Sequence, residues 1–201
     1  MKSYAYDGPA LTEPRSHPWT DSVGNASARY YDLTATPSLI RSSLEDFVPW
    51  SHYPAIDGFY SLLEWLNQPE STLESNDCAF SGPEPNPGLE LSQSLQCQGR
   101  VMLLFRALER NRGGQIARLE NGLHQSLAPL DPTFDDGAIG TTVVPVRYRA
   151  LPLGSQLGAE LMISFWAWGA TEGKCLHSLA RLMESLSKAL RQASTSLREQ
   201  R

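Results

Sequence analysis

Two adjoining stretches near the end of the chain carry most of the fold information, AELMISFWAW at residues 159–168 and EGKCLHSLARLMESLSKALRQASTS at residues 172–196. The first stretch is apolar on both faces of an extended chain, which predicts a strand in the centre of a sheet. In the second, leucines recur at the spacing of one helix face and predict a long amphipathic helix. Together they predict a helix packed across a sheet.

Further elements precede this pair. Apolar periods and turn residues predict helices at 37–48, 57–68 and 116–127, and strands at 73–80, 89–97 and 141–151. Residues 100–111 fit either period, and we favour a helix because Val101, Leu104 and Leu108 share one helical face. Pro145 indicates an edge strand or a bulge. This order predicts an α+β fold: an antiparallel sheet of about four strands, helices packed on one face and a long C-terminal helix.

The first 35 residues differ from the rest in composition. Pro9, Pro14 and Pro18 interrupt every apolar period, so we expect no long helix there. Aromatic residues are frequent in this segment, whereas freely disordered chains are poor in them. We therefore predict an extended N-terminal arm at residues 1–35, rich in Pro and aromatic residues, and a single α+β domain at residues 36–201.

Charge is distributed unevenly along the chain. Residues 36–99 carry one Arg against nine Asp or Glu, a formal net charge of −8, whereas residues 100–201 have a net charge of +4. Because no catalytic motif accompanies this asymmetry, we favour a non-catalytic protein-binding module, such as an adaptor, inhibitor, immunity or chaperone-like protein. Its acidic surface would bind another protein, of basic character. The candidate contact residues are Glu64, Glu70, Glu74 and Glu84.

The alternative function is that of an enzyme or small-molecule-binding protein with a pocket between sheet and helices. Its candidate residues combine a carboxylate, a thiol, an imidazole, two guanidinium groups and two indole rings. They are Asp77, Cys78, His124, Arg147, Arg149, Trp166 and Trp168. The two Arg share one face of a predicted strand and suit an anion or a partner surface. The two Trp also share a strand face, where they would stack a planar ligand, anchor a partner or be buried under a helix.

The spacing of the Cys, His, Asp and Glu side chains predicts no metal site, and the sequence leaves any cofactor unknown. Cys78, Cys97 and Cys175 lack zinc spacing and are too few for a disulfide framework, which fits reduced thiols. If the strands at 73–80 and 89–97 pair, Cys78 and Cys97 could face each other. The sequence contains neither a phosphate-binding loop nor a dinucleotide fingerprint.

Location and further partners follow from composition. The sequence contains no run of about 18 uncharged apolar residues, so we expect no membrane-spanning helix. The first residues lack the apolar core of a secretory signal, and the expected location is therefore the cytoplasm. The formal net charge of −5 disfavours nucleic acid as a partner, with contact through the basic last helix as a weaker alternative. The sequence leaves open whether the chain forms a homodimer.

Overall fold

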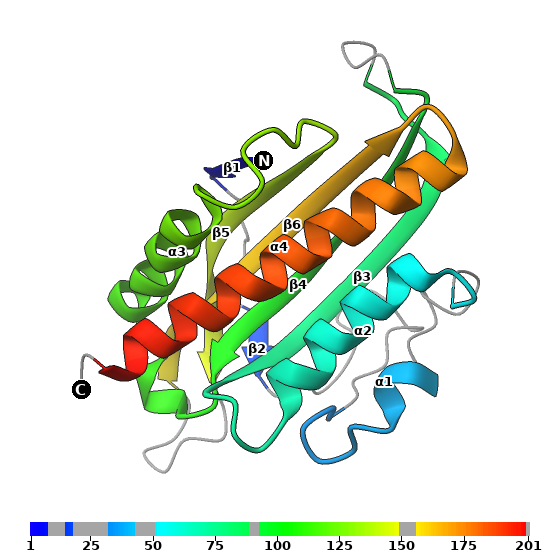
Figure 1. Ribbon diagram of the computed structural model, residues 1–201. Coiled ribbons are helices and arrows are strands. Elements are labelled where there is room, and N and C mark those ends of the chain that lie inside the picture. Colours follow the sequence, from blue (N-terminus) through cyan, green and yellow to red (C-terminus); the bar gives the residue numbers. More distant parts are fainter. Residues whose placement is uncertain (8–14, 18–31, 43–50, 89–92, 149–155, 200–201) are drawn as a thin grey trace.

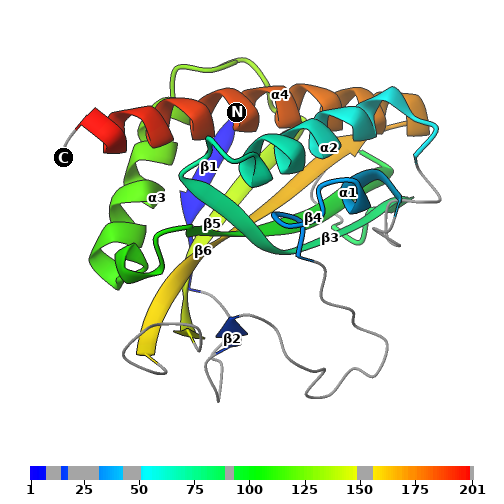
Figure 2. The same cartoon turned by 90° about the horizontal axis from the view of Figure 1, so that it is seen from below.

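The computed structural model describes residues 1–7, 15–17, 32–42, 51–88, 93–148 and 156–199. One sheet forms its centre, with α2, α3 and α4 on one face (Figures 1 and 2). The helices are α1 (Leu39–Ser42), α2 (Pro54–Asn67), α3 (Gly113–Leu127) and α4 (Glu172–Glu199). The strands are β1 (Lys2–Ala5), β2 (Arg15–His17), β3 (Leu73–Pro85), β4 (Leu95–Phe105), β5 (Gly137–Tyr148) and β6 (Gln156–Gly169), and a 3-10 turn, η2, covers Leu108–Arg110. The predicted α+β architecture with a long C-terminal helix is confirmed.

The sheet is mixed rather than purely antiparallel. Its strand order is β1-β5-β6-β4-β3, with β2 pairing β5 off this path. Strands β3 to β6 form two antiparallel hairpins that meet where β4 pairs with β6. Both β1 and β2 pair with β5 in parallel, so the sheet is larger than the four antiparallel strands expected. These two strands are short and pair with residues far away in the sequence, so no local pattern reveals them.

Parts of the predicted N-terminal arm are therefore strands of the sheet, while residues 8–14 and 18–31 of that arm lie outside the described residues. Pro145 of β5 lies between the stretch that pairs with β1 and the stretch that pairs with β2. This position suits a residue that has no backbone N–H to donate to a neighbouring strand.

Strand β4 replaces the helix favoured for residues 100–111, and that prediction is wrong. Val101, Leu103 and Phe105 face the helices, and Met102 and Leu104 on the opposite face are buried as well. A strand that is buried on both faces shows no alternation of apolar and polar residues. Its sequence therefore matches a helical period equally well.

Other boundaries differ by a few residues. Helix α2 begins at Pro54 rather than at Asp57, because proline suits the first helical turn. Of the helix predicted at 37–48, the structure shows α1, and residues 43–50 lie outside the described residues. The β3–β4 hairpin turns later than expected, since β3 continues to Pro85 and β4 begins at Leu95.

The main core lies between the sheet and the helices. Helix α4 lies over the sheet and runs lengthwise along β6 and β4 (Figure 1), and its buried face includes Leu182, Leu186 and Leu190. Phe165 of β6 packs against Phe59 of α2, with ring centroids 5.5 Å apart. A second, smaller apolar cluster contains Leu104, Val146 and Tyr148.

Candidate functional site

Strand β6 divides its side chains between the two faces of the sheet. Phe165 and Ala167 are buried in the core under the helices, whereas Trp166 and Trp168 alternate with them and are half-buried. The two Trp therefore lie on the face opposite the helices, and the interpretation that a helix covers them is wrong. We call this side of the sheet the distal face. The strand register places on this face Lys2, Tyr4, Tyr6, Glu74, Asp77, Glu84, Gln96, Gln98, Arg100, Gly140, Glu160, Ser164, Trp166 and Trp168.

An aromatic cluster occupies the distal face where β1, β5 and β6 lie side by side. Tyr4 stacks on Trp166, with ring centroids 6.3 Å apart and an interplanar angle of 10°. The Tyr6 hydroxyl lies 2.9 Å from Ser164 Oγ. Gly140 makes room for this cluster, since a Cβ atom there would lie 2.9 Å from Tyr6 and 3.1 Å from Trp166. Sequence reasoning did not connect Tyr4 and Tyr6 with the two Trp, although their spacing by two residues is typical of one strand face.

Amide and carboxylate groups adjoin the two Trp. In the cross-strand rows of the sheet, Gln98 lies beside Trp166 and Gln96 lies beside Trp168. Glu84 of β3 occupies the next position beyond Gln96. Its carboxylate accepts a hydrogen bond of 3.0 Å from Gln98 Nε2. A carboxylate is thus fixed two strands away from the indole rings, on the same face.

The distal face carries more carboxylates than cations. Asp77 forms an ion pair with Arg100, in which Oδ2 of Asp77 lies 3.2 Å from Nη2 of Arg100. The fully buried Glu160 accepts a hydrogen bond of 2.8 Å from Asn76 Nδ2. Over the described strands, four carboxylates (Glu74, Asp77, Glu84 and Glu160) share this face with three cations (Lys2, Arg15 and Arg100), where Arg15 is placed by its pairing with Val146. The arrangement places carboxylates and aromatic rings on one face, and both kinds of group attract cations.

The four acidic residues expected at a partner surface do not form one patch. Glu74 and Glu84 lie on the distal face of β3. Glu64 lies on α2, where Arg41 pairs with both Glu64 and Asp57. Glu70 is exposed in the connection between α2 and β3. The strongly acidic segment of the sequence is therefore divided between the helical layer and the sheet.

The residues of the alternative pocket also lie apart. Asp77 is on the distal face, Cys78 is on the helix-facing side of β3, and His124 is on α3. Arg147 is exposed near the end of β5, and Arg149 lies outside the described residues. Side chains that act together in catalysis must converge on one reacting atom, and these described side chains do not.

Cys78 and Cys97 do not face each other, so that expectation is wrong. Cys78 pairs in register with Val101, because the β3–β4 hairpin is longer than predicted. The sulfur of Cys97 instead lies 3.4 Å from the sulfur of Cys175. Among the described residues, no group of three or more His, Cys, Asp or Glu side chains is arranged to hold a metal ion.

His124 belongs to a polar network that joins α3 to the sheet. Its Nδ1 atom lies 3.1 Å from Ser3 Oγ, and its Nε2 atom lies 2.7 Å from Thr141 Oγ1. The Thr141 hydroxyl donates to Glu120 at 2.7 Å. Since that hydroxyl has one hydrogen, Nε2–H donates to Thr141, and Nδ1 accepts from Ser3. Burial lowers the pKa of His124, which agrees with a neutral imidazole that tethers β1.

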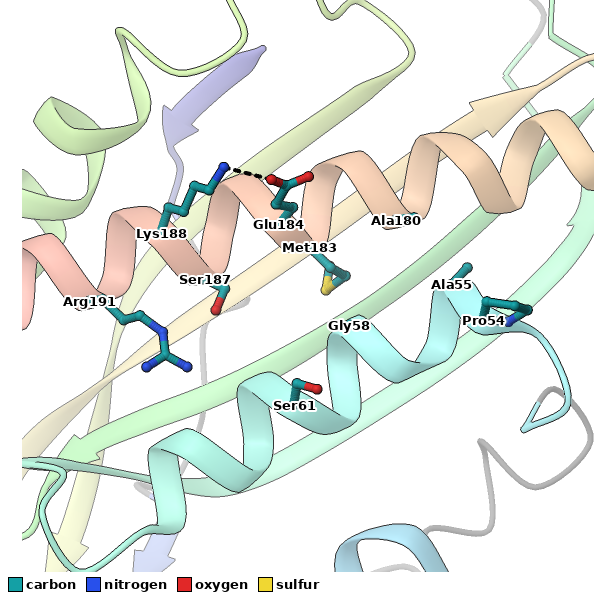
Figure 3. Close-up of a pocket in the computed structure, with 10 residues that line it drawn as sticks. All are labelled: Pro54, Ala55, Gly58, Ser61, Ala180, Met183, Glu184, Ser187, Lys188 and Arg191. Atoms are coloured by element: carbon teal, nitrogen blue, oxygen red, sulfur yellow. Dashed lines mark hydrogen bonds and ion pairs between the residues drawn. The ribbon is translucent and has the colours of Figure 1, made fainter.

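A groove of about 360 Å³ lies between α2 and α4 on the outer side of the helical layer (Figure 3). Small side chains line it on both helices, including those of Ala55 and Ser187. Its charged groups come from α4, where Lys188 pairs with Glu184 at 2.6 Å. The Arg191 guanidinium lies 4.6 Å from the centroid of the Trp65 ring. The groove is thus lined mainly by small apolar groups and has no concentration of one charge.

No protein-family model, curated protein or solved structure matches this chain. Among the described residues, no helix is both long and apolar enough to cross a membrane.

Proposed function

We propose that the protein is a non-catalytic binding protein that holds a cationic segment of a partner protein on its distal face. The observation that carries the proposal is the position of Trp166 and Trp168, two large aromatic side chains outside the helix-covered core and on the same face as the acidic groups. The proposal keeps the cytoplasmic location expected from the sequence.

Aromatic rings and carboxylates recognise the same partner groups. An Arg or Lys side chain is attracted to the face of a Trp or Tyr ring, and the attraction grows when water is excluded. A nearby carboxylate adds a charged hydrogen-bond acceptor. Tyr4 is 46% exposed and offers one such ring at the margin of the cluster. Glu84 is already oriented by Gln98 and would lose little side-chain entropy on binding.

A selection from a random peptide library against the full-length chain tests this proposal. We expect enriched peptides to contain Arg or Lys next to apolar residues, and their affinity to fall as salt concentration rises. Trp168→Ala removes the indole ring beside Gln96 and should weaken the enriched peptides about 30-fold, the loss typical of an interface hot spot. Glu84→Gln should weaken them about threefold, as expected for a half-exposed ion pair.

The matched control is Glu184→Gln, which makes the same chemical change on α4, where the side chain is exposed and paired with Lys188. It should leave peptide affinity unchanged. Enriched peptides without a cationic residue would contradict the proposal, as would an affinity that responds to Glu184→Gln and not to Glu84→Gln. Sedimentation of the chain alone tests a second copy as the occupant of the face. If the chain forms a dimer and Trp168→Ala breaks it, the occupant of the distal face is a second copy of the chain and not a cationic partner.

A further inference from the structure

Two of the three cysteines are in contact inside the core. Cys97 points from β4 toward the helices, and Cys175 lies in the first turn of α4. Their sulfur atoms are 3.4 Å apart, and both side chains are fully buried. Cys175 Sγ also lies 3.4 Å from the carbonyl oxygen of Ala167, which pairs with Cys97 across the sheet. The sulfurs therefore meet where β4, β6 and α4 converge.

The backbone on both sides of this contact is held in place. Cys97 is hydrogen-bonded within the sheet, and the amide of Cys175 donates to the Thr171 carbonyl at 2.9 Å. The end of β6 and the start of α4 are packed so closely that a Cβ atom at Gly169 would lie 2.2 Å from the Cys175 nitrogen. To form a disulfide bond of about 2.05 Å, the sulfur atoms must approach each other by about 1.4 Å from their 3.4 Å separation.

We propose that Cys97 and Cys175 are a redox-active pair that forms an intramolecular disulfide in the folded protein when a hydroperoxide oxidises Cys175. The Cys175 thiolate attacks one peroxide oxygen, the O–O bond breaks, and the other oxygen leaves as alcohol or water after gaining a proton. Cys175 is then a sulfenic acid. The Cys97 sulfur displaces hydroxide from it and forms the S–S bond, while the Cys97 proton converts the hydroxide to water. The two sulfurs lose two electrons, which the hydroperoxide gains.

The two thiols differ in a way that supports these roles. Cys175 Sγ shares a hydrogen bond with Cys97 Sγ and also lies 3.4 Å from the carbonyl oxygen of Ala167. This hydrogen bond and burial raise the pKa of Cys97, and the same hydrogen bond lowers the pKa of Cys175. The first turn of a helix also favours a thiolate. Cys175 is thus the attacking sulfur, and Cys97 resolves the sulfenic acid.

The pair can be tested without reference to partner binding. The full-length Cys78→Ser variant keeps only these two thiols and is treated with hydrogen peroxide under native conditions. We expect the intact mass to fall by two hydrogen atoms and the thiols that react with a maleimide in denaturant to fall from two to none. A non-reducing peptide map should link the peptides that contain residues 97 and 175. The temperature of unfolding should rise and return to its starting value after reduction.

Single replacements in the same background separate the two roles. With Cys97→Ser, peroxide should leave Cys175 as a sulfenic acid that dimedone traps, whereas with Cys175→Ser the Cys97 thiol should stay unmodified. If tryptophan fluorescence shows that either variant is unfolded, the Ala variant at that position replaces it. The proposal is overturned if both thiols survive peroxide treatment of the folded chain. It is equally overturned if Cys175 reaches the sulfinic acid while Cys97 is still free.

Discussion

Replacing Gly99 by Ala tests how tightly the helix-facing side of β4 is packed. A Cβ atom at this position would lie 2.4 Å from Cζ of Phe165 and 2.5 Å from the carbonyl oxygen of Ala79. Neither neighbour can yield cheaply. Ala79 belongs to the β3–β4 ladder, and the Phe165 ring is fully buried against Phe59.

The expected magnitude combines two opposing effects. Overpacking of a close-packed core costs about 3 kcal/mol at the upper end of its usual range. Replacing a strand glycine lowers the entropy of the unfolded chain and returns about 1 kcal/mol. Gly99→Ala should therefore lower the free energy of unfolding by about 2 kcal/mol, measured by guanidinium titration with tryptophan fluorescence and circular dichroism.

The matched control is Gly122→Ala in the middle of α3. A Cβ atom there would lie 3.5 Å from Cβ of Ala193 on α4, an ordinary contact. Alanine is the better helix former by about 1 kcal/mol, so this variant should be more stable than the parent chain by up to that amount. The same chemical change thus has opposite signs at the two positions. If Gly99→Ala is as stable as the parent, or if both variants lose equal stability, the described packing of Phe165 over β4 is refuted.

Two further variants test the polar groups of the interior. The side chain of Asn111 accepts a hydrogen bond of 2.7 Å from the backbone N–H of Phe105 and donates one of 2.8 Å to the backbone carbonyl of the same residue. Asn111→Ala leaves both groups unsatisfied and should cost about 3 kcal/mol in a urea titration; a cost near zero would contradict the buried bridge. Burial lowers the pKa of His124, so below about pH 6.5 the unfolded chain binds more protons and the folded state loses stability as pH falls. His124→Gln should lose less stability than the parent between about pH 7.5 and 5; equal losses would show that His124 is not the group responsible.

Local periodicity explains which elements were predicted well. The boundaries of β6 and of the long final helix lie within three residues of those predicted at 159–168 and 172–196, because their apolar patterns are unbroken. Residues 100–111 were assigned to the wrong element because burial of Met102 and Leu104 on the distal face removes the alternation that distinguishes a strand. Strands β1 and β2 were missed because a few residues cannot show where they will pair.

The candidate site was only partly accessible to sequence reasoning. Alternation within FWAW showed that Trp166 and Trp168 share a face, but not that this face lies opposite the helices. Tyr4 reaches Trp166 only because β1 pairs with β5, which is the neighbour of β6. The contact between Cys97 and Cys175 depends on the register of β4 with β6 and on the close turn into α4.

The order of amino acids alone determined the apolar periods, the excess of negative charge in residues 36–99 and the number of thiols. These are properties of a chain and its near neighbours, because backbone geometry repeats every two or 3.6 residues. Folding settled which carboxylates share a surface, which cation neutralises Glu64 and which sulfurs touch. Such relations arise from strand register and layer packing, which depend on the burial of distant segments against one another and leave no local pattern.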